Sequence, residues 1–365
     1  MSGYVGWALD APGRPLRRVE RPVPAPGPEE ALVRVAGCGV CHTDAGFLDS
    51  GVRTRHPLPL VLGHEISGWV EGAGSAFRNL VGRAVVVPAV MPCGTCADCL
   101  AGRPTVCAAQ VMPGNDRDGG FATHVVVPAR TLCEVPGAAP DGDAPIAGKT
   151  TLRHLAVVAD AVSTAYQAVH RSEAAAGDAA VVVGLGGVGG YAAQILRDRG
   201  AAVIAIDVDP GRLAAASAQG AVETIDPSAL SPKEVRARAQ AAAKGAGARS
   251  SGWKIFECSG TAAGQTTAFG LLGPAATLMV VGFTLDTVTV RLSNLMAFDA
   301  RAVGNWGCDP AHYPEIVRMV LDGRIDVVSA TEMRPLSAVE GVFADLRDHR
   351  VRGRIVLVPD GEARP

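Results

Sequence analysis

The stretch VVVGLGGVGG, residues 181–190, constrains the fold of this chain more than any other feature. Its pattern Gly184-x-Gly186-x-x-Gly189 follows an apolar run typical of a buried strand and precedes GGYAAQILRDRG, which is typical of a helix. The glycines allow a tight turn and let the backbone approach a pyrophosphate, which the N-terminus of the helix attracts. AVIAID then ends in Asp207, about 20 residues on, where a carboxylate that binds ribose is expected. Together these features predict a dinucleotide site.

The acid at the end of this segment favours one dinucleotide over the other. Asp207 would accept hydrogen bonds from the ribose 2′-hydroxyl and repel a 2′-phosphate, so we expect NAD rather than NADP. We also assign Gly187, Val188 and Arg212 to this cofactor site. Asp209 is interpreted as a turn or cap residue before the helix that begins at Pro210. The alternative is a Gly-rich turn that binds nothing.

The chain changes its pattern near residue 160. Residues 30–135 contain short strands separated by Gly and Pro, which favours an antiparallel sheet or barrel, and residues 137–149 read as a surface loop. Later segments alternate apolar strands with helices and predict a parallel doubly wound sheet. The predicted strands are 179–184, 201–207, 253–260 and 276–283, and the predicted helices are 162–175, 189–200 and 210–220.

These patterns divide the chain into three segments. A first domain is expected at 1–161 and a nucleotide-binding domain at 162–302. Residues 303–365, which end in the strand-like GRIVLVP, are expected to return to the first domain.

The nine cysteines of this apparently cytosolic chain are not expected to form a disulfide framework. Cys93, Cys96, Cys99 and Cys107 crowd into MPCGTCADCLAGRPTVC, and four thiolates can close a tetrahedral zinc shell. An iron–sulfur cluster and a reduced, metal-free loop are the alternatives. Most of the others are expected to be buried: Cys38, Cys41, Cys133, Cys258 and Cys308.

The composition of the chain argues against several classes of protein. The 365 residues are 48% hydrophobic and 19% charged, which indicates a globular protein with room for two domains. A formal net charge of -2 argues against a generally nucleic-acid-binding surface. No apolar run is as long as a membrane span, and MSGYVGWALDAPG does not resemble a signal peptide, so a cytoplasmic protein is expected.

One carboxylate in VVADAVSTAYQAV, Asp160, stands in an otherwise apolar run. An unpaired buried charge is costly, so such a residue normally has a partner or carries a neutralising proton. The local sequence alone does not supply that partner.

The motifs GCGVCHTD and LGHEISG, then the four-cysteine lobe, then VVVGLGGVGG resemble, in this order, the zinc-dependent alcohol dehydrogenases of the medium-chain family. The resemblance implies a GroES-like catalytic domain and a Rossmann domain. It also implies a catalytic zinc held by Cys41 and His64, with Asp160 at the third ligand position and Glu65 behind the metal. Taken singly, Cys41 could be a core residue, His64 a structural histidine and Asp160 a helix cap.

The same resemblance assigns further roles near these ligands. Thr43 matches the hydroxyl residue that passes the alcohol proton outward, whereas Gly46 stands where many relatives continue the relay with a histidine. His42 and Arg354 match residues that contact the pyrophosphate. Asp44 is expected to brace the site by hydrogen bonding.

Longer segments, among them VMPGNDRDGGFATHVVVPAR and RLSNLMAFDARAVGNWGC, resemble members of the family that oxidise a cyclic allylic alcohol carried as a coenzyme A thioester. Arg53 and Arg55, beside His56, are the better candidates for CoA contacts, and the basic residues of 232–254 are interpreted as a solvated face. A dehydrogenase of another alcohol or polyol, and a non-enzymatic zinc-ribbon protein, are the alternative functions. A homo-oligomer, dimer or tetramer, is expected by analogy.

Overall fold

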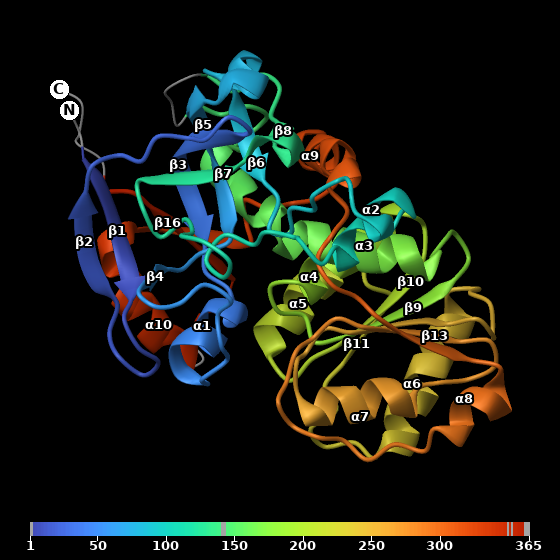
Figure 1. Ribbon diagram of the computed structural model, residues 1–365. Coiled ribbons are helices and arrows are strands. Elements are labelled where there is room, and N and C mark those ends of the chain that lie inside the picture. The colour runs from blue at the N-terminus through green and yellow to red at the C-terminus, as the bar shows by residue number, and fades with distance from the viewer. Residues whose placement is uncertain (1–2, 140–143, 349, 352, 361–365) are drawn as a thin grey trace. The chain divides into compact units, whose positions relative to one another are not determined.

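The structure is a computed structural model that describes residues 3–139, 144–348, 350–351 and 353–360. Part of the loop expected at 137–149, residues 140–143, lies outside the described residues. The chain forms two compact units (Figure 1). The first comprises Met1–Ser163 and Gly307–Pro365, and the second comprises Thr164–Trp306. The domain boundaries expected after residues 161 and 302 stay predictions.

The first unit is built on a mostly antiparallel sheet of seven strands with the order β15-β16-β3-β5-β6-β8 and with β7 paired to β3. β16 lies antiparallel to β3, with Val356 opposite Gly39. The final strand is therefore hydrogen-bonded to the strand that leads into the GVCHTD motif. The bounds are β3 Glu30–Gly39, β5 Glu65–Ala73, β6 Ala84–Val87, β7 His124–Pro128, β8 Cys133–Glu134, β15 Thr331–Pro335 and β16 Arg354–Val358.

A second sheet of this unit has the order β2-β1-β4, and one apolar core joins both sheets. Phe121 and Phe343 meet edge to face in this core, with ring centroids 6.1 Å apart. The strands are β1 Tyr4–Leu9, β2 Arg17–Arg21 and β4 Leu60–Val61. The α-helices are α1 His42–Asp49, α2 Ala97–Leu100, α9 Tyr313–Leu321 and α10 Val339–Arg347. The 3-10 helices are η1 Ser75–Leu80, η2 Pro104–Val106, η3 Ala129–Thr131, η4 Leu152–Ala159, η5 Pro310–His312 and η6 Leu336–Ala338.

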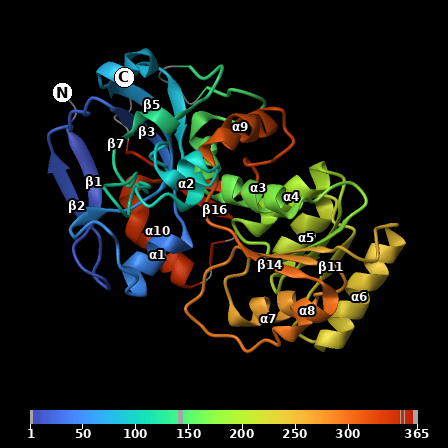
Figure 2. The same cartoon turned by 45° about the vertical axis from the view of Figure 1, so that its right-hand side comes forward.

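The second unit is a parallel sheet of six strands with the order β11-β10-β9-β12-β13-β14. α4 and α5 lie on one face and α6 and α7 on the other (Figure 2). This confirms the doubly wound parallel sheet. The strands are β9 Ala179–Val183, β10 Ala202–Ile206, β11 Glu223–Ile225, β12 Lys254–Glu257, β13 Thr277–Val280 and β14 Arg301–Gly304. The helices are α3 Ala161–Ser172, which begins in the first unit, α4 Gly189–Asp198, α5 Pro210–Ala218, α6 Pro232–Gly245, α7 Ala262–Gly270 and α8 Ser293–Phe298.

The strands of this sheet are buried because helices cover both faces. β9 has the sequence AAVVV and is buried at all five positions, which explains why it reads as a continuous apolar run rather than an alternating one. α6 begins at a capping box in which Ser231 and Glu234 bond each other's backbone N–H groups. Asp209 caps α5 by accepting the N–H of Arg212, as its position before the helix indicated.

Candidate active site

Four potential metal ligands of the first unit converge, although they are far apart in the chain. The ligand atoms of Cys41, His64, Glu65 and Asp160 all lie within 4.8 Å of one another. Asp160 Oδ2 is 3.4 Å from His64 Nε2 and 4.0 Å from Cys41 Sγ. His64 and Glu65 have no exposed surface, whereas the side chain of Asp160 is 20% exposed. The cluster is thus buried on one side and accessible through Asp160.

Local structure accounts for the placement of Cys41 and His64. Cys41 caps the start of α1, and Asp44, three residues on, accepts its backbone N–H at 3.0 Å. The other oxygen of Asp44 accepts the N–H of Gly63 at 3.1 Å and lies 3.3 Å from His64 Nδ1. The carboxylate of Asp44 is fully buried and connects both segments that carry ligands, which is the bracing expected of it.

Glu65 lies beside the cluster and faces a buried arginine. Arg354 Nη2 is 3.2 Å from Glu65 Oε1, and Arg354 Nη1 donates to the carbonyl of Val40 at 3.1 Å. Burial raises the pKa of Glu65 to about 7, and the guanidinium opposes that shift. A Cβ on Gly39 would lie 2.0 Å from Glu65 Oε2, so only glycine leaves room for this carboxylate. The pairing of Arg354 with Glu65 was not predicted, because no local signal joins residues almost 300 positions apart in the chain.

The residues fit a zinc ion on two grounds. The Nε2 atom of His64, which faces Asp160, is buried without a hydrogen bond of acceptable geometry among the described residues, and such a nitrogen is costly unless a cation binds it. In a tetrahedral zinc site, nitrogen and oxygen ligands are about 3.3 Å apart, and sulfur and oxygen ligands are about 3.6 Å apart. The separations of Asp160 Oδ2 from His64 and Cys41 lie near these values.

The cysteine lobe forms a second cluster, and all nine cysteines of the chain are free thiols. Neighbouring sulfurs of Cys93, Cys96, Cys99 and Cys107 are 3.5 to 4.0 Å apart, whereas sulfurs around a tetrahedral zinc are about 3.8 Å apart. Hydrogen bonding from backbone N–H groups, first that of Thr95, lowers the pKa of Cys93 to about 6. That environment favours a thiolate, the form that binds metal.

The remaining cysteines are mostly buried, as expected. Cys38, Cys133 and Cys308 are buried, like Cys41, and Cys258 is half-buried.

The glycine fingerprint of the second unit joins the carboxyl end of β9 to the start of α4. A Cβ on Gly189 would lie 1.7 Å from the carbonyl oxygen of Gly184, so the turn closes only with glycine at this position. Gly187 and Val188 lie inside the turn, and Val188 precedes the helix as its cap residue. The N-terminus of α4 therefore stands directly behind the backbone of the turn, which is the arrangement that binds pyrophosphate.

Asp207 follows β10 and its side chain reaches back to the same turn. One carboxylate oxygen accepts the N–H of Leu185 at 2.6 Å, and the other accepts that of Asp209 at 2.9 Å. Arg212 Nη1 is 3.7 Å from Asp207 Oδ2. Each oxygen keeps a lone pair for a further donor, so the predicted contact with a ribose hydroxyl is chemically available.

Three other predicted site residues lie on or near α1. Thr43 Oγ1 is 3.7 Å from Cys41 Sγ, and Thr43 is half-buried. His42 is exposed at the first position of the helix, and Gly46 is half-buried one turn further on. The predicted pyrophosphate contacts of His42 and Arg354 stay predictions.

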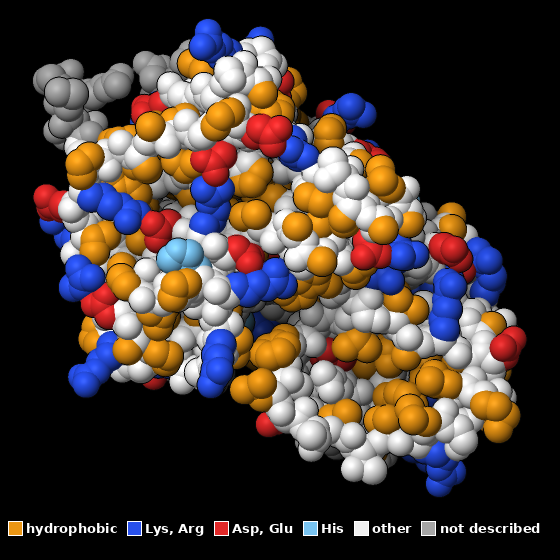
Figure 3. All heavy atoms as spheres, viewed as in Figure 1, with side chains coloured by type: hydrophobic (Ala, Val, Ile, Leu, Met, Phe, Trp, Pro, Cys, Tyr) orange, Lys and Arg blue, Asp and Glu red, His pale blue; other side chains and the backbone are white. Residues whose placement is uncertain are grey.

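The distribution of surface charge and the length of the apolar helices concern nucleic-acid and membrane binding. Lys and Arg side chains are interspersed with Asp and Glu on the face drawn in Figure 3, without a continuous basic area. Among the described residues, no helix is both long and apolar enough to span a membrane.

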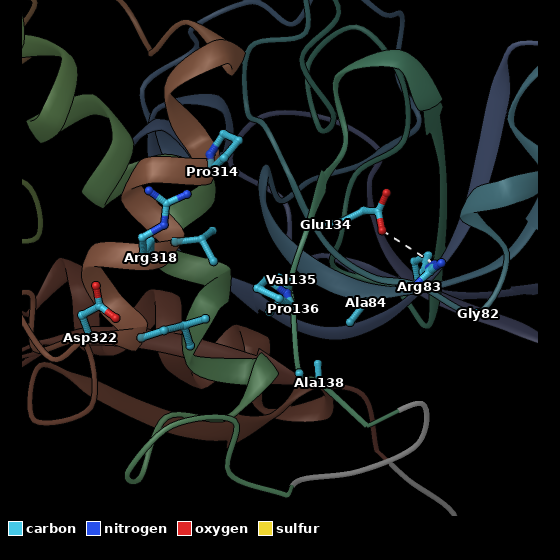
Figure 4. A pocket seen from close by; sticks show the side chains of 13 residues that line it. Gly82, Arg83, Ala84, Glu134, Val135, Pro136, Ala138, Pro314, Arg318 and Asp322 are labelled. Carbon is cyan, nitrogen blue, oxygen red and sulfur yellow. Dashed lines mark ion pairs between the residues drawn. The ribbon is translucent and has the colours of Figure 1, made fainter.

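A hollow of about 730 Å³ lies between α9 and the segment around Glu134 (Figure 4). Arg83, Glu134 and Arg318 line it, and it contains none of the predicted site residues.

Comparison with known proteins places this architecture in a family. The family model described as "Alcohol dehydrogenase GroES-like domain" matches residues 27–137, and "Zinc-binding dehydrogenase" matches residues 187–322. An alcohol dehydrogenase of Geobacillus stearothermophilus is 26% identical over 347 residues, covering 94% of this chain and 96% of the relative. An L-threonine 3-dehydrogenase of Bacillus subtilis is 28% identical and covers 93% and 94% of the two chains.

Solved structures agree with this result. The cobalt- and zinc-bound alcohol dehydrogenase of Pyrobaculum aerophilum superimposes with a TM-score of 0.83 at 26% identity, over 98% of this chain and 100% of that one. The fold and the clusters thus define an oxidoreductase that acts on CH–OH groups. The chain belongs to the zinc-dependent medium-chain alcohol dehydrogenases, whose cofactors are zinc and a nicotinamide dinucleotide.

Proposed function

We propose that this protein oxidises a secondary alcohol with NAD at a zinc site formed by Cys41, His64 and Asp160. The observation that carries the proposal is the convergence of these three side chains, from segments up to 119 residues apart, on one small volume. A zinc ion held by these three residues would supply the Lewis acidity that makes an alcohol hydroxyl easier to deprotonate.

The chain's own residues provide alignment and a path for the proton. Thr43 Oγ1, near Cys41, accepts the proton of the alcohol and passes it outward. Gly46 has no side chain to continue this path, so solvent takes the proton beyond Thr43. Glu65 stays behind the ligands, where Arg354 holds its carboxylate. A nicotinamide dinucleotide would supply the hydride acceptor, and the turn around Gly186 together with Asp207 would hold its pyrophosphate and ribose.

The four-cysteine lobe has a separate role in this proposal. Cys93, Cys96, Cys99 and Cys107 bind a second zinc, and because four thiolates leave no open position, that zinc stabilises the loop and takes no part in the reaction. Metal analysis distinguishes zinc from an iron–sulfur cluster, since the latter would contain iron and sulfide.

We further propose that the substrate is 6-hydroxycyclohex-1-ene-1-carbonyl-CoA, oxidised to 6-oxocyclohex-1-ene-1-carbonyl-CoA in anaerobic benzoyl-CoA degradation. The support is the resemblance of long segments in both units to 6-hydroxycyclohex-1-ene-1-carbonyl-CoA dehydrogenase, including the aspartate at position 160. The relatives named above are dehydrogenases of other substrates, such as threonine. A zinc dehydrogenase of another secondary alcohol or a polyol is therefore the alternative.

Measurement of NADH formation distinguishes the CoA thioester from other alcohols as the substrate. Purified protein receives NAD with the thioester, with the same hydroxy acid without CoA, or with a panel of secondary alcohols and polyols. We expect rapid NADH formation with the thioester only. Turnover of simple alcohols with the thioester ignored would keep the zinc mechanism and reject the CoA substrate.

A charge variant tests recognition of CoA. Arg53 is exposed on the loop after α1, whereas Arg55 pairs with Asp116 at 3.3 Å. We expect Arg53→Ala to raise KM for the thioester and to leave kcat unchanged. Arg14→Ala removes another exposed arginine of the same unit and serves as the matched control. Equal KM values in the two variants would remove Arg53 from the CoA site.

We also propose that the protein is a homo-oligomer. Five of the large apolar side chains that are exposed lie within residues 283–306, which include the edge strand β14: Phe283, Leu285, Leu292, Met296 and Trp306. An apolar surface beside an unpaired strand edge is typical of an interface. Light scattering coupled to size-exclusion chromatography would report the mass of the assembly, and a monomer at micromolar concentration would reject the proposal.

A further inference from the structure

A buried tyrosine far from the ligands in the chain is hydrogen-bonded to the backbone beside one of them. Tyr313 is the first residue of α9 and is 1% exposed. Its hydroxyl donates to the carbonyl of Ala159, the residue before Asp160, at 2.6 Å. Burial raises the pKa of this tyrosine well above its usual value, so the hydroxyl stays protonated and can donate.

Ser163 connects the same groups from the other side. Its Oγ is 3.0 Å from the hydroxyl of Tyr313, 3.2 Å from the carbonyl of Asp160 and 3.3 Å from the carbonyl of Ala159. The backbone N–H of Ala89, after β6, also donates to the carbonyl of Ala159 at 3.1 Å. Three separate segments of the first unit therefore meet at one peptide group.

This peptide group lies where the backbone changes direction. η4 ends at Ala159 and α3 begins at Ala161, so Asp160 is the single residue between two helical segments. Its torsion angles, φ −138° and ψ −62°, are not helical. Because Asp160 lies between these two helical segments, the direction of its carboxylate depends on the backbone torsion angles at this junction.

We propose that Tyr313, with Ser163, is a positioning residue for the zinc ligand Asp160. It acts through the backbone and touches neither the metal nor the substrate. The proposal rests on the assignment of Asp160 as a zinc ligand in the proposed function. Groups that orient metal ligands without binding the metal typically change metal affinity by about 10–100-fold when they are removed.

The hydroxyl of Tyr313 can be removed by a small substitution. Pro314, Arg318 and Asp322 line the hollow of Figure 4, and Tyr313 is absent from its lining. Tyr313→Phe keeps the ring that fills the core and removes only the hydroxyl.

The test measures release of zinc rather than turnover. The zinc-loaded enzyme is mixed with a coloured chelator, and the zinc of the four-cysteine lobe serves as an internal reference. We expect Tyr313→Phe to release zinc from the Asp160 site about 10–100-fold faster, with release from the lobe unchanged. In the cobalt-substituted protein, the visible band of cobalt at this site should shift, which a loss of general stability would not cause.

Two further variants complete the design. Tyr4→Phe removes the hydroxyl of another buried tyrosine of the same unit and keeps the ring that faces the guanidinium of Arg21, so it should leave zinc release unchanged. Ser163→Ala should also accelerate release. Combining it with Tyr313→Phe should give less than the product of the two effects, since the two hydroxyls contact each other and share the carbonyl of Ala159. Ser163→Ala also provides the test if Tyr313→Phe does not fold.

The results distinguish failure of the role assigned to Tyr313 from failure of the assignment of Asp160 as a zinc ligand. If Tyr313→Phe releases zinc within twofold of the unchanged protein and keeps the cobalt band, the tyrosine serves packing alone and the inference is wrong. If Asp160→Ala still retains both zinc ions with unchanged release rates, Asp160 is not a ligand, and the proposed site itself fails irrespective of Tyr313.

Discussion

The buried carboxylate of Asp44 offers a quantitative test of how the site is held together. In Asp44→Ala, the N–H groups of Cys41 and Gly63 each lose their acceptor inside a fully buried region. An unsatisfied buried donor costs about 1–3 kcal/mol, so the two together predict a loss of about 2–6 kcal/mol in the free energy of unfolding. Asp44→Asn keeps one oxygen acceptor and places an NH2 group against the other donor, so its loss should be intermediate.

Asp49, on the same helix, provides the control. Its carboxylate accepts two hydrogen bonds from Arg347 at 2.8 and 2.9 Å, but the two side chains are 30% and 45% exposed. An exposed ion pair contributes about 0–1 kcal/mol, so Asp49→Ala should cost no more than that.

Urea-induced unfolding measures both variants. The free energy follows from the midpoint and the slope, at one fixed zinc concentration, because bound metal adds to the apparent stability. The reasoning would be refuted if Asp44→Ala and Asp49→Ala lost the same free energy, since burial and hydrogen bonding would then make no difference.

Three further changes address the other sites. Asp160→Ala should leave one zinc per chain by metal analysis and abolish NADH formation, and retention of two zinc ions would contradict the ligand assignment. Cys107→Ser should remove the lobe zinc while the zinc at Asp160 remains, with a lower Tm; two zinc ions at full occupancy would show that the lobe does not need this thiolate. Asp207→Asn keeps an acceptor for the N–H of Leu185 but removes the charge beside Arg212, so kcat/KM for NADP relative to NAD should rise at least about tenfold. An unchanged ratio would mean that Asp207 does not select the cofactor.

Features encoded over short stretches of chain could be predicted from the sequence. The turn around Gly184 and Gly189 could be recognised locally, since β9, the glycines and α4 follow one another directly. The sulfurs of the cysteine lobe come from 15 consecutive positions, 93–107, and their spacing alone indicated a metal cluster. The parallel sheet follows from alternating apolar runs and helices, because such runs must be covered on both faces. Asp209 as a helix cap is equally local.

The arrangement around Asp160 depends on tertiary structure. Nothing near position 160 specifies that its carboxylate will lie 3.4 Å from His64, because that distance depends on the path of the chain through both sheets. The motif resemblance pointed to the ligand position, but the surrounding contacts came only with the fold. Arg354 faces Glu65 because β16 pairs with β3, and Tyr313 reaches Ala159 because α9 packs against η4. Local sequence determines turns, caps and short-range metal spacing, whereas the partners of a buried charge are set by long-range packing, which no short pattern encodes.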